Sequence, residues 1–450
     1  MKHKIRLLML VVAMLSMLIV VAGCSKKEKD TPSDITNNTA EVDEDINNAS
    51  DEQGTADEGV SDDIDSNDTV VEESNEEEVD EIEEVEEAEE AEEAEEVNDY
   101  IVGELPLVAD GIKSVFESLG FLQTGTCINA MAIKDYSDHI LQNYNSITLE
   151  NEMKPDAILN HAKSIEAGDL VVEYTKRTTD LLDWAKAAGI KARGHVLVWH
   201  SQTPQWIFYE DFDTKKALVD RDTMLARMES YIKQNFEFLE AQGYIDMFYA
   251  YDIVNEAIND DGSLRESKWL EIIGDDFIWH AFYFADKYAP EHVKLYYNDF
   301  NEQFKTKHFV KLAESLVDED GRSLIDGLGC QGHLYTKDSI DQYINMLEAF
   351  KATGLEVQIT ELDISLGTWT NILQATDENL REQGQYYYEF INRIVEGNKA
   401  GTTNVSGITF WGVSDSLSWR RERSPLLFDL NFKPKYSYFG VVQDKEHAGY

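Results

Sequence analysis

The sequence predicts an α/β fold, a (β/α)8 TIM barrel, for residues 101–450. From residue 101 onward, short apolar runs alternate with longer amphipathic stretches. Strands that alternate with helices in this way favour parallel βαβ units. Eight such units favour a closed barrel with elaborated loops over an open sheet, and a barrel of this size forms one domain.

The apolar pattern places each expected element along the chain. The expected strands are the short runs at 121–129, 146–150, 191–199, 247–254, 293–297, 325–330, 356–360 and 406–411. The expected helices lie between them and include 223–242, 277–288, 338–351 and 382–396. Cys127 and Cys330 fall on expected strands, which favours buried free thiols over a disulfide between them.

Polar or aromatic residues stand at the carboxyl ends of these runs. They are Glu150, His195, Glu256, Asn298, His333, Glu361 and Trp411. In barrel enzymes this face carries the chemistry. One such residue alone is more often a solvated strand end, but seven together predict an enzyme.

The charge of the chain is very uneven and excludes some classes of partner. The formal net charge is −49. Residues 25–100 hold 33 acidic and 3 basic side chains, whereas residues 101–450 carry a net −22. An acidic surface repels phosphates and anionic lipids, so we expect no nucleic-acid partner. A neutral polymer or a cation fits better.

The first 23 residues are predicted to be a lipoprotein signal peptide. Lys2, Lys4 and Arg6 precede an apolar run at 7–21, which is too short for a comfortable membrane span. The run leads into Val-Ala-Gly-Cys, which resembles the bacterial lipobox, so we expect lipidation of Cys24. An ordinary cleaved signal is the alternative. The expected location is extracellular, anchored to the surface of a bacterial cell through this lipid.

Residues 24–100 are predicted to be an acidic disordered linker. The tract has almost no apolar anchors and ends in a Glu/Ala repeat at 86–96. Like charges extend such a chain, and its glutamates four residues apart disfavour a helix. As a flexible coil it would reach roughly 45–50 Å r.m.s.. A tether that holds the barrel off the cell surface is its simplest use.

Two of the 88 acidic residues stand out by context. Glu256 and Glu361 each follow an apolar run predicted to be a strand, and Glu256 also follows Asn255. Cleavage of a glycosidic bond needs two carboxyl groups, one to protonate the leaving oxygen and one to attack or stabilise the anomeric carbon.

Around these glutamates the chain resembles the family 10 glycoside hydrolases, the xylanase family, from about residue 104 to 442. The matching segments are 150–155, 193–195 with 199–200, 252–256, 331–333, 359–363, and 411–412 with 419. The resemblance implies a retaining endo-1,4-β-xylanase with Glu256 as acid/base and Glu361 as nucleophile. It also implies that Asn255 bonds the sugar 2-hydroxyl and that His333 and Asp363 hold Glu361.

The same resemblance implies groups that bind xylan and xylo-oligosaccharides. The expected hydrogen-bonding groups are Glu150, Asn151, Lys154, His195 and Gln331, and the expected flat walls are Trp199, Trp411 and Trp419. Residues 297–299 resemble a further family segment and receive a supporting role. We expect a monomer that needs no metal and no cofactor.

The sequence can be weighed against four alternatives: a metal enzyme, an esterase, another β-glycanase and a glycan-binding protein. His195, His200 and His333 lack the close spacing of a metal site, and no G-x-S-x-G elbow points to an esterase. A cellulase or mixed β-glycanase would use the same two carboxylates. A non-catalytic glycan-binding protein on the same barrel predicts the loss of one carboxylate, yet both are present.

Overall fold

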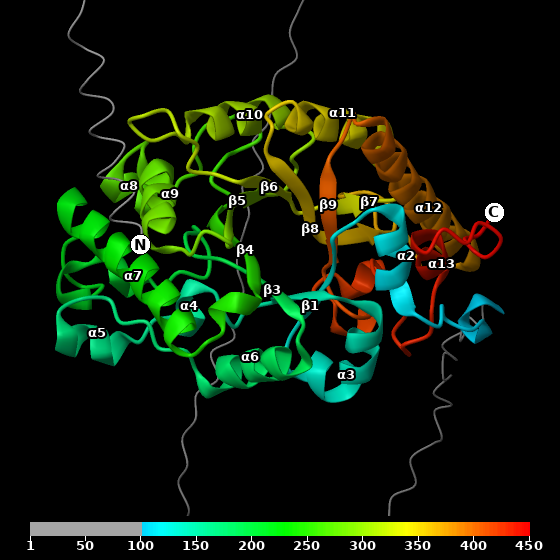
Figure 1. Ribbon diagram of the computed structural model, residues 1–450, viewed down its shortest axis with the longest axis horizontal. Coiled ribbons are helices and arrows are strands. Elements are labelled where there is room, and N and C mark those ends of the chain that lie inside the picture. The colour runs from blue at the N-terminus through cyan, green and yellow to red at the C-terminus, as the bar shows by residue number, and fades with distance from the viewer. Residues whose placement is uncertain (1–100) are drawn as a thin grey trace, which may run out of the picture. The chain divides into compact units, whose positions relative to one another are not determined.

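A computed structural model describes residues 101–450 as a closed barrel of parallel strands (Figure 1). The signal peptide, Cys24 and the acidic linker lie outside the described residues. The barrel strands are β1 (Gln123–Ile128), β2 (Ser146–Leu149), β3 (Lys191–Gly194), β4 (Phe248–Asn255), β5 (Lys294–Asp299), β6 (Gly327–Cys330), β8 (Glu356–Ser365) and β9 (Val405–Phe410). Each pairs in parallel with the next, β6 pairs with β8, and β9 closes the ring on β1. The predicted TIM barrel is confirmed.

Helices connect most of the strands and surround the barrel (Figure 1). In chain order they are α2 (Gly111–Leu119), α3 (Ala130–Asn143), α4 (Pro155–Ile158), α5 (His161–Ala167), α6 (Lys176–Ala188), α7 (Arg221–Ala241), α8 (Lys268–Ile273), α9 (Phe277–Tyr288), α10 (Thr306–Ser315), α11 (Ile340–Lys351), α12 (Asp377–Ala400) and α13 (Tyr436–Val441). Short 3-10 helices are η1 (Ile101–Glu104), η2 (Gln205–Phe208), η3 (Glu210–Phe212), η4 (Ile245–Met247), η5 (Asp415–Leu417) and η6 (Arg421–Arg423). The four predicted helices are confirmed. α7 and α12 begin where Asp220 and Thr376 accept a backbone N–H from the first turn.

Two strands differ from the prediction by more than two residues, and one short strand was not predicted. β3 ends at Gly194, and the rest of the predicted run forms no regular strand but pairs with β4 in an isolated bridge between Val198 and Val254. β8 continues to Ser365, so Glu361 lies within a strand and not after it. The extension has its own partner, the short strand β7 (His333–Tyr335), which the sequence did not predict. Its apolar signal is too short to recognise.

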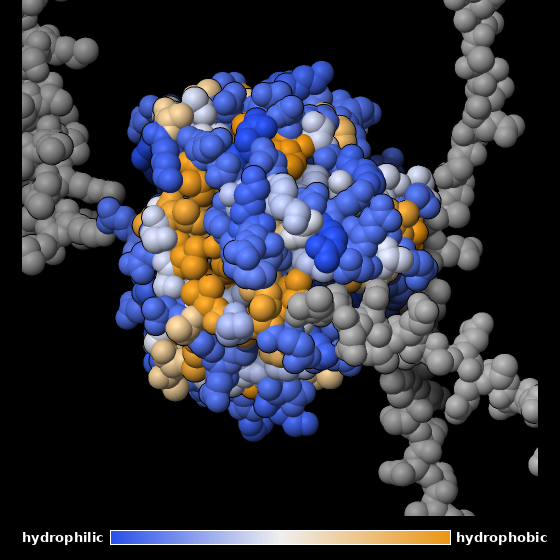
Figure 2. Space-filling model, turned by 90° about the vertical axis from the view of Figure 1, so that its right-hand side faces the viewer, coloured by the Kyte–Doolittle hydropathy of each residue, from blue (hydrophilic) through white to orange (hydrophobic). Residues whose placement is uncertain are grey.

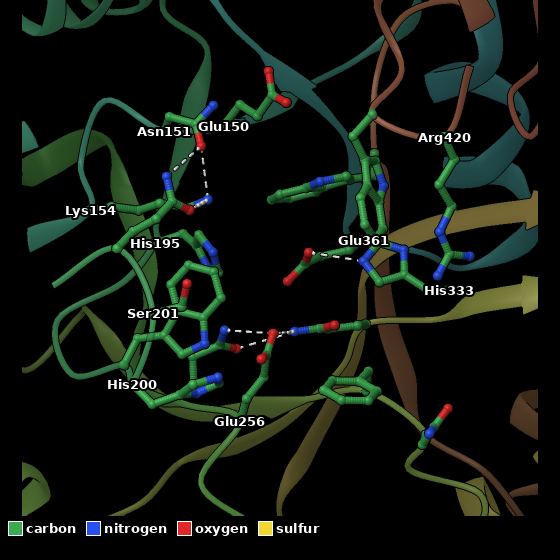
Figure 3. A pocket seen from close by; sticks show the side chains of 18 of the residues that line it. Glu150, Asn151, Lys154, His195, His200, Ser201, Glu256, His333, Glu361 and Arg420 are labelled. Atoms are coloured by element: carbon green, nitrogen blue, oxygen red, sulfur yellow. Dashed lines mark hydrogen bonds and ion pairs between the residues drawn. The ribbon is translucent and has the colours of Figure 1, made fainter. Parts of the chain in front are cut away.

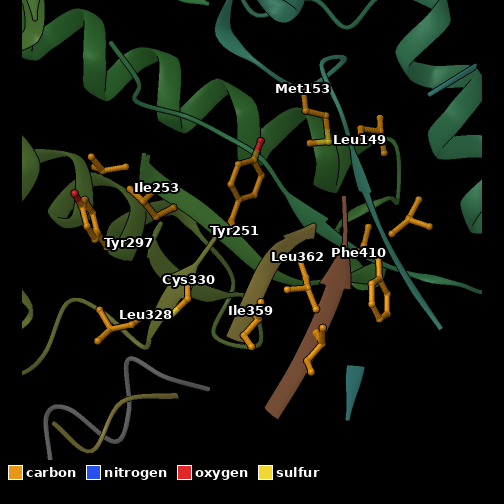
Figure 4. Packing of buried hydrophobic residues seen from close by; sticks show 14 of the residues in the cluster. Leu149, Met153, Tyr251, Ile253, Tyr297, Leu328, Cys330, Ile359, Leu362 and Phe410 are labelled. Carbon is orange, nitrogen blue, oxygen red and sulfur yellow. The ribbon is translucent and has the colours of Figure 1, made fainter. Parts of the chain in front are cut away.

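The core divides into an apolar layer outside the barrel and a polar column within it. Alternate strand residues such as Tyr251 and Ile253 pack among the buried apolar side chains (Figure 4). Asp252 lies between them in sequence and bonds Arg193 inside the barrel. Cys127 and Cys330 are buried free thiols, as expected.

One face of the molecule combines a largely hydrophilic surface with a band of apolar residues down one side (Figure 2). Within residues 101–450, no helix is both long enough and apolar enough to cross a bilayer.

Candidate active site

A cleft of about 890 Å³ opens at the carboxyl ends of the barrel strands. Every sugar-binding and catalytic residue expected from sequence lines it: Glu150, Asn151, Lys154, His195, Trp199, Asn255, Glu256, Gln331, His333, Glu361, Trp411 and Trp419. Figure 3 shows the Glu256 and Glu361 carboxylates pointing into the same cavity, with Lys154 and Asn151 on one wall. The barrel thus gathers residues that are far apart in the chain.

Glu361 is placed by an irregularity in β8. Between Ile359 and Leu362, the two residues Thr360 and Glu361 of β8 lie opposite a single residue of β9, as in a β-bulge. The consecutive side chains of Thr360 and Glu361 therefore both reach Asn298. Thr360 donates its hydroxyl to Asn298 Oδ1 at 2.6 Å, and Asn298 Nδ2 donates to Glu361 Oε1 at 2.7 Å.

His333 bridges two carboxylates behind the cleft. Its Nε2 lies 3.3 Å from Glu361 Oε2, and its Nδ1 lies 3.0 Å from Asp363 Oδ2. Asp363 also accepts hydrogen bonds from the Trp419 indole at 2.9 Å and from Arg420 at 3.2 Å. Burial alone would lower the pKa of His333, but the two carboxylates outweigh it and raise this pKa to about 9. The imidazole is therefore cationic at neutral pH.

The His333 cation helps to keep the Glu361 carboxylate ionised. Burial on its own would raise the pKa of Glu361, since only 5% of the residue is exposed. The contact with His333, the charges of His195 and His333, and the Asn298 hydrogen bond together hold that pKa below its usual range. Glu361 is an anion at neutral pH, as a nucleophile must be.

Glu256 sits in a different environment at the exit of β4. Its backbone has a φ of 54°, and its N–H donates to the Asn298 carbonyl at 2.9 Å. Its Oε1 accepts from the side-chain amides of Asn255 at 3.1 Å and Gln331 at 3.0 Å. These donors are neutral, and no cation lies within ion-pair distance of Glu256 among the described residues. The two glutamates therefore differ in their electrostatic surroundings.

Asn298 connects the two glutamates. Its Nδ2 bonds both Glu361 and, at 3.0 Å, the Asn255 amide oxygen. This close approach requires glycine on the neighbouring strand, because a Cβ on Gly329 would lie 2.4 Å from Asn298 Oδ1. From the sequence, residues 297–299 were expected to have only a supporting role. The sequence did contain a signal for a larger role of Asn298, because this residue is one of the polar residues at the expected strand ends.

His195 is oriented by a buried network that the sequence did not predict. Its Nδ1 lies 3.0 Å from Asp252 Oδ2, and Asp252 pairs with Arg193. Arg193 also donates to Gln358 at 3.0 Å and lies 4.2 Å from the centre of the Tyr296 ring. Asp252 and Arg193 belong to segments that carried the family resemblance, but their buried pairing requires the closed barrel.

The wall opposite Glu361 carries polar groups held in place by one another. Lys154 donates to Asn151 at 2.9 Å and to Gln202 at 2.7 Å, and it lies 5.0 Å from the centre of the Trp199 ring. Burial lowers the pKa of Lys154, although neighbouring carboxylates partly offset this. Glu150 accepts from Asn129 at 2.9 Å. This wall presents fixed donors and acceptors.

The cleft also extends past Glu256 in a direction that the sequence did not reveal. Its further lining residues are Phe300, Asn301, Gln303, Phe304, Tyr335, Asp338, Trp369 and Arg420. Trp369 is 72% exposed and meets Tyr335 edge to face at 6.4 Å. The stretches that supply Phe304 and Trp369 are loops, for which apolar periodicity gives no signal.

The arrangement favours chemistry that uses two carboxyl groups. Within residues 101–450, no set of three or more His, Cys, Asp or Glu side chains is arranged to hold a metal ion. An anionic glutamate and a second glutamate with neutral donors face one cavity whose walls include four tryptophans. A (β/α)8 barrel with such a pair at its strand ends defines the class of barrel glycosidases.

The chain belongs to glycosyl hydrolase family 10. The model of that family matches residues 111–444, which confirms the resemblance drawn from the sequence segments. The chain is 37% identical over 344 residues to the bifunctional endo-1,4-β-xylanase XylA of Ruminococcus flavefaciens, covering 74% of this chain and 34% of that protein. It is 37% identical over 314 residues to endo-1,4-β-xylanase B of Butyrivibrio fibrisolvens, covering 68% and 48%. The chain thus spans a third to a half of the length of these relatives.

Solved structures agree with this assignment. The CBM22-1–GH10 modules of Clostridium thermocellum xylanase 10B, complexed with xylohexaose, superpose with a TM-score of 0.66 at 33% identity and cover 75% of this chain and 68% of that one. XynB of Paenibacillus barcinonensis, complexed with a conduramine derivative, superposes with a TM-score of 0.64 at 30% identity and covers 74% and 99%.

The His333 bridge predicts a pH-dependent stability. Its folded pKa of about 9 lies above the ordinary value of 6.5. The stability from the bridge is therefore complete below pH 6.5 and is lost as the pH rises to about 9. We expect the free energy of unfolding to fall across this interval by on the order of 3 kcal/mol. His333→Gln should remove this fall, whereas exposed His292→Gln should keep it. Urea titrations at several pH values measure the free energy of unfolding. If that free energy falls with pH in His333→Gln as it does in the wild type, the bridge is contradicted.

Proposed function

We propose that this protein is a retaining endo-1,4-β-xylanase that cleaves internal β-1,4-xylosidic bonds of xylan by double displacement. The observation that carries the proposal is the unequal surroundings of the two glutamates. Glu361 is held as an anion by cationic His333, whereas the hydrogen bonds to the Glu256 carboxylate come from two neutral side-chain amides. A nucleophile and an acid need this difference.

In the first step Glu361 attacks the anomeric carbon while Glu256 gives its proton to the leaving oxygen. The glycosidic C–O bond breaks, a glycosyl ester forms on Glu361, and the shortened chain leaves with the Glu256 proton. Asn298 and His333 aim the attacking carboxylate. Retaining glycosidases hold their two carboxyl groups about 5–5.5 Å apart, so that one can attack while the other gives its proton to the leaving oxygen.

In the second step the roles change. Ester formation removes the negative charge of Glu361, so Glu256 can remain ionised after giving up its proton. Glu256 then takes a proton from water as the water attacks the anomeric carbon, and Glu361 departs as a carboxylate. Two inversions give net retention of the β configuration.

The walls of the cleft support a polysaccharide substrate. On one side of the glutamates, Glu150, Asn151, Lys154 and His195 offer hydrogen bonds to sugar hydroxyls. We assign contact with the 2-hydroxyl to Asn255, further hydroxyl contacts to Gln331, and flat contacts with sugar faces to Trp199, Trp411 and Trp419. The cleft continues on the other side to Phe304 and Trp369, which supports cleavage within a chain.

The names of most of these relatives support xylan as the substrate, and the name of one relative supports a β-glucan instead. Several are called endo-1,4-β-xylanases, and one solved structure carries xylohexaose. However, a relative from Acetivibrio thermocellus that is 30% identical over 339 residues is called exoglucanase XynX. If the protein hydrolyses cellulose faster than xylan, it is a β-glucanase that uses the same mechanism and not a xylanase.

The test is hydrolysis of β-1,4-xylan, with the anomer of the product followed by NMR at early times. We expect short xylo-oligosaccharides with the β-anomer first. If the α-anomer appears first, the reaction inverts and Glu361 is not the nucleophile. No release by folded protein would favour another β-glycan or a glycan-binding protein.

We also propose that Cys24 carries a lipid, that residues 1–23 are its signal peptide, and that the acidic linker 24–100 tethers a monomeric barrel to the outer face of a bacterial cell. The lipobox-like sequence and the charge of the linker support this proposal. Deleting residues 25–98 should leave kcat on soluble xylan unchanged within about twofold, because all the residues assigned a role in the cleft belong to residues 101–450. Cys24→Ala should move the enzyme from the membrane fraction to the medium. A large loss of kcat after the deletion, or membrane retention of Cys24→Ala, would contradict the tether.

A further inference from the structure

We propose that Glu302 is a positioning residue for both glutamates of the cleft and acts through the backbone of Gly332. The inference rests on the proposed function for the roles of Glu256 and Glu361. Glu302 does not line the cleft and would touch no substrate. It would act by fixing the turn that carries their partners.

Glu302 is a buried carboxyl group that faces a backbone donor. Only 1% of the residue is exposed, and it stands just beyond β5. Its Oε1 accepts the Gly332 N–H at 3.1 Å and the Tyr343 hydroxyl at 3.0 Å. A buried acid is costly to the fold unless hydrogen bonds compensate it, so an apolar residue would serve packing alone better.

Gly332 lies between the two residues that contact the glutamates. On one side the Gln331 amide donates to Glu256, and on the other side His333 pairs with Glu361. Gly332 has a φ of +74°, and a Cβ there would lie 2.8 Å from Ile359 Cγ2. A shift of this turn would therefore move the partners of both glutamates at once.

The turn is held from two sides. On the barrel side, the Gln331 carbonyl accepts the Glu361 N–H at 2.9 Å, and the Gly332 carbonyl accepts the Asp363 N–H at 3.3 Å. On the outer side, Glu302 holds the Gly332 N–H. Without an acceptor there, a buried N–H is left unpaired, which the turn can relieve only by moving.

The groups that face Glu302 come from three elements. They are Tyr343 from α11, Cys330 from β6, and Lys305 just before α10. Burial raises the pKa of Glu302 to about 7, although hydrogen bonds from Tyr343 and Gly332 and the charge of Lys305 act against the rise. Either protonation state leaves an oxygen that can accept the Gly332 N–H.

The test compares three variants of the full chain. Glu302→Leu fills the volume but removes the acceptor, Glu302→Gln keeps an amide oxygen, and Tyr343→Phe removes only the other hydrogen bond to Glu302. His333, His195, Lys154 and Cys127 face Glu361 and stay unchanged in all three. Displacing His333 would let the pKa of Glu361 rise. We expect the acid limb of kcat/KM on xylohexaose to move up by about one pH unit in Glu302→Leu. It should stay in place in Glu302→Gln and Tyr343→Phe.

A second measurement needs no turnover. Titration of the His333 ring by 1H–15N NMR should give the wild-type pKa of about 9. In Glu302→Leu it should fall toward the ordinary range of histidine. If Glu302→Leu does not fold, Glu302→Met serves the same purpose. Folded variants with an unmoved acid limb and an unmoved His333 titration would overturn the inference. If the wild-type protein does not cleave xylan, the proposed function is wrong. The NMR titration of His333 then still tests whether Glu302 positions the turn at Gly332.

Discussion

Glu361→Ala is expected to lower kcat on xylan by on the order of 10⁴-fold to 10⁶-fold while the affinity for xylo-oligosaccharides changes by less than about tenfold. The turnover is lost because no group remains to form the glycosyl ester. Binding persists because the groups assigned to sugar hydroxyls, among them Glu150 and Lys154, lie on the opposite wall. Steady-state kinetics and calorimetric titration with xylohexaose measure the two quantities separately.

A small anion can identify the missing role of Glu361. With an activated aryl β-xylobioside, azide can enter the space left by the carboxylate and expel the phenolate in one displacement. The product of Glu361→Ala should therefore be the α-azide, inverted relative to the substrate. The control Glu291→Ala removes an exposed glutamate between α9 and β5 and should behave as wild type. Near-normal turnover by Glu361→Ala without azide would remove Glu361 from the mechanism.

The sequence predicted the barrel well because its signals are local. Each strand is a short apolar run bounded by a helix, so Cys127 on β1 and Cys330 on β6 could both be placed as buried thiols. Glu256 and Glu361 could be chosen because each stands beside or inside such a run. The error on Glu361 has a physical cause, since the bulge in β8 and the short strand β7 prolong a strand that the apolar pattern ends too early.

The connections within the site could not be predicted, because they join residues far apart in the chain. Asn298 reaches Glu361 across 63 residues, and Arg193 reaches Gln358 across 165 residues. These contacts exist only after β5 and β8 have taken their places around the ring. A buried polar residue within an apolar run, such as Asp252, looks unfavourable until its partner is known. The Trp369 side of the cleft depends on loops and was not visible for the same reason.

The differing surroundings of the two glutamates matter for mechanism because an enzyme must keep an anion and an acid in one small cavity. His333 supplies a positive charge to Glu361, and Asp363 with its Trp419 and Arg420 contacts keeps that histidine charged. Glu256 has amide neighbours that can remain in place whether it is protonated or ionised. Under the proposed mechanism, Glu256 can therefore exchange its acid and base roles without any rearrangement of Glu361.

Glu256→Ala is expected to separate substrates by their leaving groups. With xylohexaose, whose leaving sugar oxygen needs a proton, kcat/KM should fall by on the order of 10³-fold to 10⁴-fold. With an aryl β-xylobioside whose phenolate leaves unaided, kcat/KM should fall by less than about tenfold, because formation of the glycosyl ester on Glu361 needs no acid.

The second half of the reaction provides an independent check. Without a base, water attacks the ester slowly, so Glu256→Ala should release a burst of phenol followed by slow turnover. Azide needs no deprotonation and should accelerate this phase, giving the β-azide, the opposite anomer to that from Glu361→Ala. Stopped-flow absorbance and NMR of the azide product measure both effects. Equal losses on xylohexaose and on the aryl substrate would remove the acid role from Glu256, and an α-azide would mean that the two glutamates had been assigned in the wrong order.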